Sequence, residues 1–201
     1  MAEKDQQIDR IVLVRHGLPA LSRKVRLTWR EYRDWWLKYD EGGLDENQKI
    51  PPKVIELAKQ ADIVISSPLR RAVETATLLR GKPPDLTDPD LVEADLPSPK
   101  LGALKLRPQT WGFLARIVWY VGWADGMESH SDARIRANVM AAKLESQATG
   151  GKLVLVTAHG WYNRMVKGSL MTQGWKCISQ NGDLHWSHRI MERETDYYNE
   201  R

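Results

Sequence analysis

The sequence predicts an α/β fold, a three-layer α/β/α sandwich around a mostly parallel central sheet. Three short, mainly aliphatic runs at residues 11–14, 62–66 and 152–157 suit strands that are covered on both faces, as the strands of parallel sheets are. Segments with helical spacing separate these runs, and alternating strands and helices favour this layered class. A chain of 201 residues has room for one substantial core, so we expect a single domain over residues 1–201.

The first predicted strand, residues 11–14, runs directly into Arg15, His16 and Gly17. Ligands of open α/β sheets bind outside the carboxyl ends of the strands, where these three residues would lie. Residues 18–49 follow and are rich in tryptophan and tyrosine, with helical spacing over residues 29–36. Aromatic side chains at this spacing usually pack as a hydrophobic cluster, and a wall of a binding pocket is the alternative interpretation.

The middle of the chain predicts a strand between two helices. A proline pair at 51–52 can open a helix over residues 53–60, and the run at 62–66 reads as a second buried strand. The next helix is expected over residues 69–80, because Gly81 supplies a carboxyl cap. Arg71 near its start opposes the helix dipole and indicates an anion nearby. Residues 86–87 and 91–93 are interpreted as short edge segments.

The last third of the chain repeats the opening pattern. Helices are expected over residues 110–121 and 129–148, the second begun by Ser129 as cap with Asp132 in its first turn. The strand at 152–157 then runs into Ala158, His159 and Gly160, as the first strand runs into a histidine-glycine pair. A helix over residues 162–171 and an antiparallel edge strand over residues 184–194 complete the predicted fold.

Charge and composition narrow the class of ligand. The net charge of +4 suits an anionic ligand such as a small phosphorylated substrate or inorganic phosphate, while 30 basic and 26 acidic residues are interspersed, which argues against a nucleic-acid arm. Cys177 stands alone, so no intrachain disulfide is possible. The apolar run near the amino terminus is too short for a signal peptide or membrane span, so we expect no membrane and a cytoplasmic location.

No metal or other cofactor is expected. His185 and His188 are three residues apart, which in a strand places them on opposite faces, so a shared metal ion is disfavoured.

Four linked motifs carry a family resemblance. They are Arg15-His16-Gly17, the segment Ser66-Ser67-Pro68-Leu69-Arg70-Arg71-Ala72-Val73-Glu74-Thr75-Ala76, Glu93, and Val156-Thr157-Ala158-His159-Gly160. In this order and rough spacing the chain resembles the histidine phosphatase superfamily, the phosphoglycerate-mutase-like phosphatases, from about residue 11 to residue 171. The resemblance implies a phosphoglycerate-mutase-like fold, in which insertions at about 18–50 and 97–127 form a cap or pocket wall over the carboxyl ends of the strands.

The resemblance also implies roles for individual residues. His16 would be the nucleophile that becomes phosphorylated, Glu93 the proton donor to the leaving group, and three side chains would hold the phosphoryl oxygens: Arg15, Arg71 and His159. Guanidinium groups match phosphoryl oxygens in a two-pronged geometry, and a neutral imidazole is a competent nucleophile when its other nitrogen is held by a carbonyl near Gly17. Gly17, Gly160 and the backbone amide of Trp161 are expected to complete the substrate site.

Two positions allow a choice of residue. The arginine that directly precedes alanine, four residues before threonine, fits the family pattern, which selects Arg71 over Arg70. Glu93 is preferred to Asp95 as the acid because it follows a short apolar segment. The sequence after Glu93 departs from the glycine-rich continuation common in the family, and this weakens the transfer of any known substrate.

The resulting hypothesis is a metal-independent phosphomonoester hydrolase that acts on a small phosphorylated metabolite through a phosphohistidine. A phosphoglycerate-type mutase is the alternative, kept open by Lys100, Lys105 and Arg107 as a second anion cradle. A catalytically silent phosphate-binding or interaction module ranks third. The loop cations at positions 23, 24 and 26 either engage a second anionic group of the substrate or are solvated. The identity of the substrate and the oligomeric state stay open.

Overall fold

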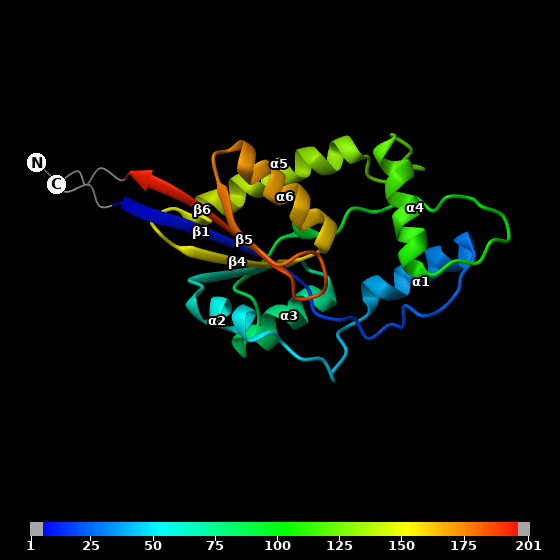
Figure 1. Cartoon of the computed structure of the whole chain (residues 1–201), viewed down its shortest axis with the longest axis horizontal. Coiled ribbons are helices and arrows are strands. Elements are labelled where there is room, and N and C mark those ends of the chain that lie inside the picture. Colours follow the sequence, from blue (N-terminus) through cyan, green and yellow to red (C-terminus); the bar gives the residue numbers. More distant parts are fainter. Residues whose placement is uncertain (1–5, 197–201) are drawn as a thin grey trace, which may run out of the picture.

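The computed structural model describes residues 6–196 and contains one six-stranded sheet with helices on both faces (Figure 1). Helices α5 and α6 cover one face, and α2 and α3 cover the other, so the predicted three-layer α/β/α sandwich is confirmed. The strands are β1 (Gln6–Arg15), β2 (Ile63–Ser66), β3 (Leu86–Thr87), β4 (Leu153–Ala158), β5 (Lys176–Gln180) and β6 (His188–Asp196). The helices are α1 (Trp29–Glu41), α2 (Pro52–Gln60), α3 (Arg70–Arg80), α4 (Pro108–Tyr120), α5 (His130–Ala148) and α6 (Gly160–Thr172), with the short 3₁₀ turn η1 (Pro89–Leu91).

The strand order is β3-β2-β4-β1-β6-β5. The first four strands in this order run parallel to one another, and β6 pairs antiparallel with β1 and with β5. The aliphatic residues of β1 and β4 have almost no exposed surface because helices pack on both faces of these central strands. The continuous apolar runs that predicted them are thus explained by burial on both sides.

One predicted strand is absent, and another, correctly predicted to be antiparallel, differs in its start and its position in the sheet. Residues 91–93 form no strand, because the Asp88 side chain accepts from the Asp90 amide and starts the turn η1, in which Pro89 has no amide to donate to a ladder. The strand predicted over residues 184–194 begins only at His188 and is internal, since β5 lies outside it at the sheet edge. The preceding turn holds Trp186 at a φ of 64°.

Helix boundaries follow the predicted capping residues closely. Gly81 takes a left-handed φ of 71° and ends α3, and the Ser129 side chain accepts from the Asp132 amide at the start of α5. In α1, Thr28 and Glu31 form a reciprocal capping box. Among the residues that the structure describes, no helix combines the length and apolarity needed to cross a bilayer.

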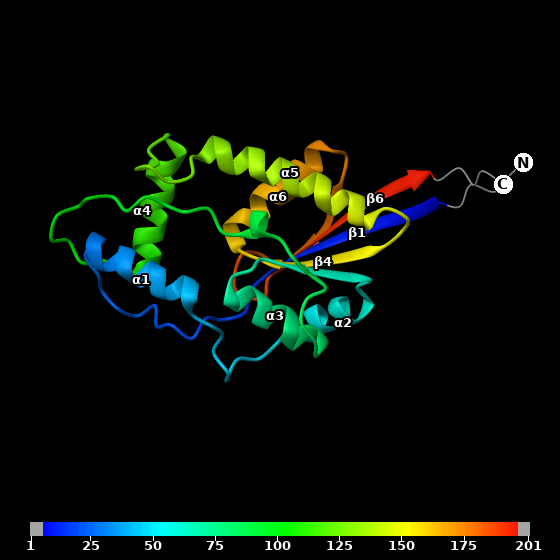
Figure 2. The same cartoon turned by 180° about the vertical axis from the view of Figure 1, so that it is seen from behind.

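Helices α1 and α4 come from the two chain segments between the core elements, and they stand beyond the carboxyl ends of β1 and β4 in both views (Figures 1 and 2). They pack against each other through an aromatic cluster that includes Tyr32, Trp35, Tyr39 and Trp111. The indole of Trp111 donates to the Leu27 carbonyl at 2.7 Å, which ties α4 to the segment that leads into α1. This pair of helices therefore forms one wall at the end of the sheet where the histidine-glycine pairs lie.

Candidate active site

The parallel pairing of β1 with β4 brings two histidines to one end of the sheet. Arg15 lies opposite Ala158 in the register, and the His16 amide donates to the Ala158 carbonyl at 2.9 Å. His159 is the residue after Ala158, and the ring centroids of His16 and His159 lie 5.3 Å apart. Both side chains are buried.

The His16 ring is held in one tautomer. Its Nδ1 lies 2.8 Å from the Gly17 carbonyl, and since a carbonyl only accepts, Nδ1 carries the proton and Nε2 keeps its lone pair. Burial first, and then the neighbouring His159 and Arg71, hold the pKa of His16 well below its usual range. The side chain is therefore a neutral imidazole with a free Nε2, which is the form that can act as a nucleophile.

Gly17 allows the backbone to pass close to its neighbours. A Cβ at this position would lie 2.5 Å from the ring of Trp186 and 2.6 Å from the side-chain oxygen of Gln48. The Gly17 amide donates to the Thr75 hydroxyl at 2.9 Å, which connects the loop to α3. Only glycine fits here without displacing these groups, and the carbonyl that orients His16 depends on this path.

Both ring nitrogens of His159 have partners. Nδ1 lies 3.3 Å from a guanidinium nitrogen of Arg71, which can only donate, so Nε2 carries the proton and donates to the Ser67 hydroxyl at 2.9 Å. Burial and then Arg71 lower the pKa of His159 well below its usual range. His159 is thus a neutral donor, and to contact a phosphoryl oxygen it must exchange one of these partners.

Arg71 and Arg70 have opposite environments. Arg71 is 1% exposed, donates to the Tyr39 carbonyl at 3.1 Å and forms an ion pair with Asp40 at 2.9 Å. The side chain of Arg70 is 67% exposed and pairs with Glu74 one turn along α3. The structure therefore places Arg71, and not Arg70, beside the two histidines.

Arg15 lies between the two strand ends. Its guanidinium donates to the Asp183 carbonyl, and a Cβ on Gly160 would lie 3.0 Å from its Cδ and Nε atoms. The absence of a side chain at Gly160 therefore lets Arg15 pack flat on the start of α6. Burial lowers the pKa of Arg15, which leaves it a cation with few solvent contacts. Its buried Nε has no hydrogen-bond partner within residues 6–196.

Glu93 reaches the same cavity from the segment after η1. Its carboxylate accepts from the backbone amides of Tyr162 at 2.9 Å and Trp161 at 3.4 Å, in the first turn of α6. The Trp161 amide was expected to bind phosphate, but it donates to Glu93. Asp95 is exposed and does not line the cavity.

Two adjoining hollows form the site. The inner hollow, about 110 Å³, is lined by residues that follow the strand ends, by aromatic residues of α1 and by one residue of α3. They include His16 and His159, Trp36 and Tyr39, and Arg71. The outer hollow, about 270 Å³, is lined by residues of α4 and α6 and of the turn before β6. They include Phe113, Gly160, Trp161, Arg164 and Asp183. Five residues line both hollows: Arg15, Arg23, Glu93, Gln109 and Arg116.

Three residues lie at the site although the sequence did not predict them there: His185, Arg116 and Gln109. His185 was expected in a strand, but it lies in the turn before β6 with its ring centroid 5.5 Å from that of His16. Burial and then Arg15 lower the pKa of His185 to about 3. Arg116 and Gln109 reach the cavity only because α4 folds over the sheet end, and no local pattern predicts that contact.

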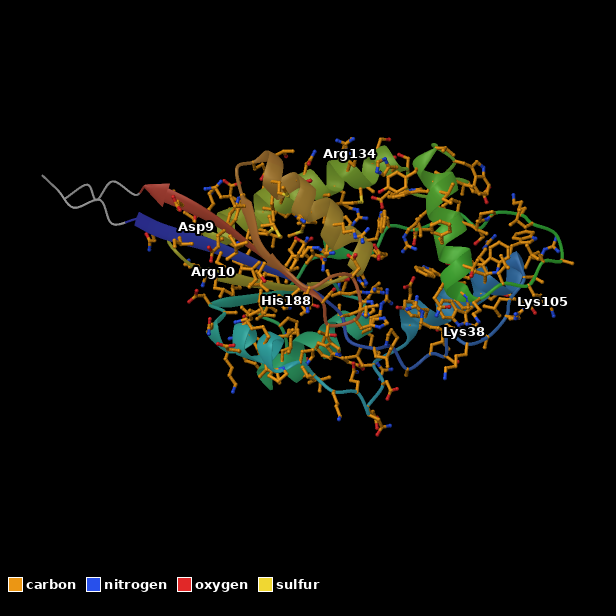
Figure 3. The ribbon with its side chains drawn as sticks, in the orientation of Figure 1. Asp9, Arg10, Lys38, Lys105, Arg134 and His188 are labelled. Carbon is orange, nitrogen blue, oxygen red and sulfur yellow. The ribbon has the colours of Figure 1, made fainter. Side chains whose placement is uncertain are left out.

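Of the other predicted cations, only Arg23 lines these hollows. Of the loop cations, Arg23 lines them, whereas Lys24 and Arg26 do not. The Lys100 ammonium lies 3.5 Å from a carboxylate oxygen of Asp125. Lys105 lies beside α1 at the end of the molecule farthest from the sheet (Figure 3). The second cradle that the mutase alternative needs is therefore absent at these positions.

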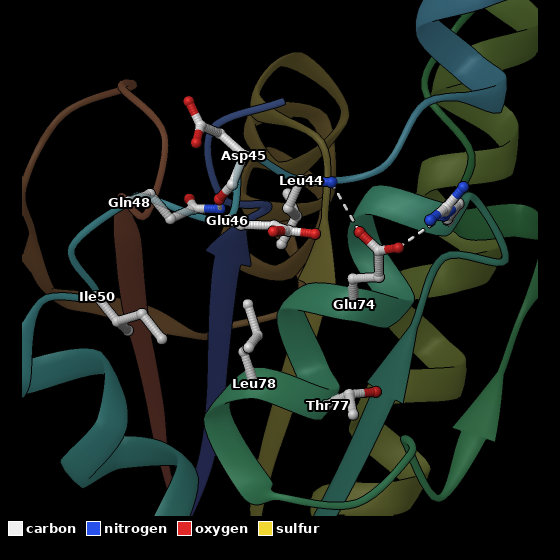
Figure 4. A pocket seen from close by; sticks show the side chains of 9 residues that line it. Leu44, Asp45, Glu46, Gln48, Ile50, Glu74, Thr77 and Leu78 are labelled. Atoms are coloured by element: carbon white, nitrogen blue, oxygen red, sulfur yellow. Dashed lines mark hydrogen bonds and ion pairs between the residues drawn. The ribbon is translucent and has the colours of Figure 1, made fainter. Parts of the chain in front are cut away.

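A larger hollow of about 460 Å³ lies beside α3 (Figure 4). Its wall includes Glu74, whose carboxylate is occupied by the Leu44 amide and the Arg70 side chain. It contains neither histidine nor unpaired cation, so we assign the chemistry to the smaller hollows. Within residues 6–196 no cluster of three or more histidine, cysteine or acidic side chains could hold a metal ion.

Comparison with known proteins gives one family. The model of a family described as the histidine phosphatase superfamily (branch 1) matches residues 11–186. No curated protein matches the sequence.

Solved structures resemble the fold. A protein from an open reading frame of Mycobacterium tuberculosis is 26% identical with a TM-score of 0.51, over 78% of this chain and 77% of that chain. A mycobacterial glucosyl-3-phosphoglycerate phosphatase is 22% identical with a TM-score of 0.53, over 83% and 81% of the two chains. A phosphoserine phosphatase from Entamoeba histolytica is 15% identical with a TM-score of 0.56, over 92% and 94%.

Proposed function

Because the chain belongs to the histidine phosphatase superfamily, as its motifs predicted, we propose that it is a phosphomonoester hydrolase that acts on a small phosphorylated metabolite through a phosphohistidine at His16. The observation that carries the proposal is the state of His16. This residue is neutral, its Nδ1 is fixed by the Gly17 carbonyl, and its free Nε2 belongs to a cavity that Arg15 and Arg71 also line. A nucleophile beside two guanidinium groups is suited to attack on a phosphoryl group.

The reaction follows from these positions in two steps. In this proposal Glu93 starts the cycle as a protonated carboxyl group. Nε2 of His16 attacks phosphorus while the ester P–O bond breaks, and the Glu93 carboxyl transfers its proton to the leaving alkoxide, which departs as an alcohol. Water then attacks the phosphohistidine, the P–N bond breaks, and the Glu93 carboxylate takes the proton of the attacking water. Inorganic phosphate is released, and His16 and Glu93 return to their starting states.

The other polar residues of the site stabilise the transition state or orient the groups that do. Arg15 and Arg71 neutralise the charge on the equatorial oxygens as it redistributes during in-line transfer. His159 contributes a neutral donor, and the ring of His185 packs beside that of His16. The Asp40 ion pair orients Arg71, since a guanidinium held at two edges has little rotational freedom.

Hydrolysis is favoured over transfer between two positions of one substrate. A mutase has to retain a second phosphoryl group and exclude water, and the cations predicted for that task, Lys100, Lys105 and Arg107, line neither hollow. Two of the solved structures similar to this chain are themselves named phosphatases. These names support the class of reaction.

The test measures phosphate release and the intermediate together. Purified wild type, His16→Ala and the control His130→Ala are incubated with a panel of phosphomonoesters in the presence of a chelator, and quenched samples are analysed for acid-labile protein-bound phosphate. We expect release and a trapped phosphoenzyme with wild type and His130→Ala, and neither with His16→Ala. Activity that survives in His16→Ala would overturn the mechanism.

Two further outcomes separate the alternatives. Movement of phosphate between positions of a phosphoglycerate without net release would establish a mutase. Saturable phosphate binding by the wild type, with no turnover of any ester in the panel, would establish a binding module.

A further inference from the structure

Two arginines beside the proposed phosphoryl site have no acidic partner within residues 6–196. Arg23 and Arg116 come from the two insertions and line both hollows. The Nε atom of each is buried, and neither has a hydrogen-bond partner within residues 6–196. Arg116 does donate to the Gly112 carbonyl at 2.9 Å and lies over the Trp161 ring at 5.1 Å, so its guanidinium is positioned. A positioned cation with an unused buried donor is suited to an anionic ligand.

The neighbouring charges leave these two cations uncompensated. The pair Arg164 and Asp183 in the outer hollow forms its own ion pair, and Asp40 is engaged by Arg71. Glu93 is the acid that lines both hollows, and its carboxylate accepts two backbone amides of α6. Within residues 6–196, neither Arg23 nor Arg116 forms an ion pair with an acidic side chain.

The position of the pair relates it to the leaving group. The inner hollow holds His16, Arg71 and His159, the residues proposed to surround the phosphoryl group. Arg23 and Arg116 line the junction with the outer hollow, as Glu93 does. Because Glu93 is proposed to protonate the leaving oxygen, the groups at this junction face the alcohol part of the substrate.

We propose that Arg23 and Arg116 bind an anionic group on the leaving alcohol, so that the preferred substrates are small phosphomonoesters that carry a carboxylate or a second phosphate. This inference rests on the proposed phosphatase function. The two hollows, about 110 and about 270 Å³, lie together near the lower end of the ~300–1,000 Å³ typical of ligand pockets, which limits the alcohol to a few carbon atoms. Guanidinium donors bind carboxylates and phosphates alike, and the test therefore includes both.

The first experiment compares esters that differ only in the distal group. The carboxylate pair is 3-phosphoglycerate with glycerol 3-phosphate, and the phosphate pair is propane-1,3-diol bisphosphate with 3-hydroxypropyl phosphate. We expect kcat/KM for the wild type to be ~10–100-fold higher for the anionic member of at least one pair, as for a charged hydrogen bond. The pair that shows the larger ratio identifies the anion.

The second experiment removes the two cations. In Arg23→Gln and Arg116→Gln we expect the ratio within that pair to fall ~10-fold, chiefly through KM, with turnover of the neutral ester changed less than threefold. Arg30→Gln is the matched control, because Arg30 is exposed on α1, stacks on Trp29 and lines neither hollow. This variant should keep the wild-type ratio.

These outcomes distinguish a failure of the proposed anion site from a failure of the proposed phosphatase function. Wild-type ratios near one in both pairs, with phosphate still released through His16, would overturn the anion site and leave the phosphatase. Loss of turnover for the anionic and the neutral ester alike in Arg116→Gln would also overturn it, by showing a general role. If a variant fails to fold, competitive inhibition of the wild type by glycerate but not by glycerol supports the site, and equal weak inhibition contradicts it.

Discussion

At the scale of single residues, the sharpest contrast is between Arg71 and Arg70. These adjacent side chains share their type and helix, but only Arg71 is buried beside His159. If Arg71 stabilises the transferred phosphoryl group, Arg71→Gln should lower kcat by ~10²–10³, as the loss of one preorganised donor does in other enzymes. Arg70→Gln should stay within about threefold of wild type, because neither Arg70 nor its partner Glu74 lines the two hollows of the candidate active site.

Steady-state kinetics on one ester checks this prediction, with thermal denaturation of both variants to verify folding. Equal losses of kcat in the two variants would contradict the assignment of Arg71.

Gly160 is predicted to act through Arg15. A Cβ in Gly160→Ala would lie 3.0 Å from two Arg15 side-chain atoms, so the arginine must shift by a few tenths of an ångström. Small displacements of a binding group can cost ~10²-fold in rate, and we expect kcat/KM to fall ~10-fold or more while the melting temperature changes little. Gly168→Ala is the control, because Gly168 lies in the same helix and a Cβ added there would meet no atom within 4 Å. Unchanged kinetics in Gly160→Ala would show that Arg15 tolerates the shift.

At the scale of elements, Arg136 connects α5 to the segment that carries Glu93. Its guanidinium donates to the carbonyls of Asp90 and Val92, at 2.6 and 2.8 Å, and forms a two-pronged pair with Glu128. Arg136→Met keeps the apolar stem but leaves these acceptors unpaired. We expect ~1–3 kcal/mol less unfolding free energy and a lower kcat, because Glu93 loses its support.

A neighbour on the same helix provides the control for Arg136. Lys143 pairs with Asp88 and Asp90 in the same segment, but its side chain is 45% exposed. Lys143→Met should therefore cost less than ~1 kcal/mol and leave kcat unchanged. Urea unfolding gives the free energy of unfolding of both variants, and steady-state kinetics gives their kcat. Similar losses in Arg136→Met and Lys143→Met would contradict a specific role for Arg136.

The elements also show what could be predicted from the sequence. Strands β1 and β4 were predictable because burial on both faces requires a continuous apolar run, and α3 because Gly81 has to end it. Strand β5 was missed, since its mostly exposed residues at the sheet edge need no apolar pattern. The segment at 91–93 was misjudged because Asp88 and Pro89 favour a turn that outweighs the short apolar pair.

At the scale of the whole molecule, the site depends on contacts between distant segments. The motif residues Arg15, His16, Arg71 and His159 could be named from sequence because parallel strands place their carboxyl ends together. Arg116 and His185 could not, since their approach depends on how α4 and the turn before β6 pack over the sheet end. Motifs therefore predicted which residues meet at the proposed phosphoryl site, while its surroundings required the tertiary structure.

The same burial makes the folded state sensitive to acid. Burial is the largest cause that lowers the pKa values of His16, His159 and His185, the last to about 3, whereas an unfolded chain has histidine pKa values near ~6.5. Below pH ~6.5 the unfolded state thus binds more protons than the folded state, so the unfolding free energy falls as the pH is lowered. The limit is ~1.4 kcal/mol per pH unit for each histidine.

His185→Gln isolates one of these contributions. The variant cannot titrate at this position, so its unfolding free energy should fall less than that of wild type between pH 7 and pH 5, by about 1 kcal/mol after allowance for solvent access to this partly exposed ring. Urea unfolding followed by tryptophan fluorescence at several pH values gives both curves, and carboxylates common to the two proteins cancel in their difference. A difference independent of pH would mean that His185 keeps an ordinary pKa and does not pack beside His16 as a neutral ring.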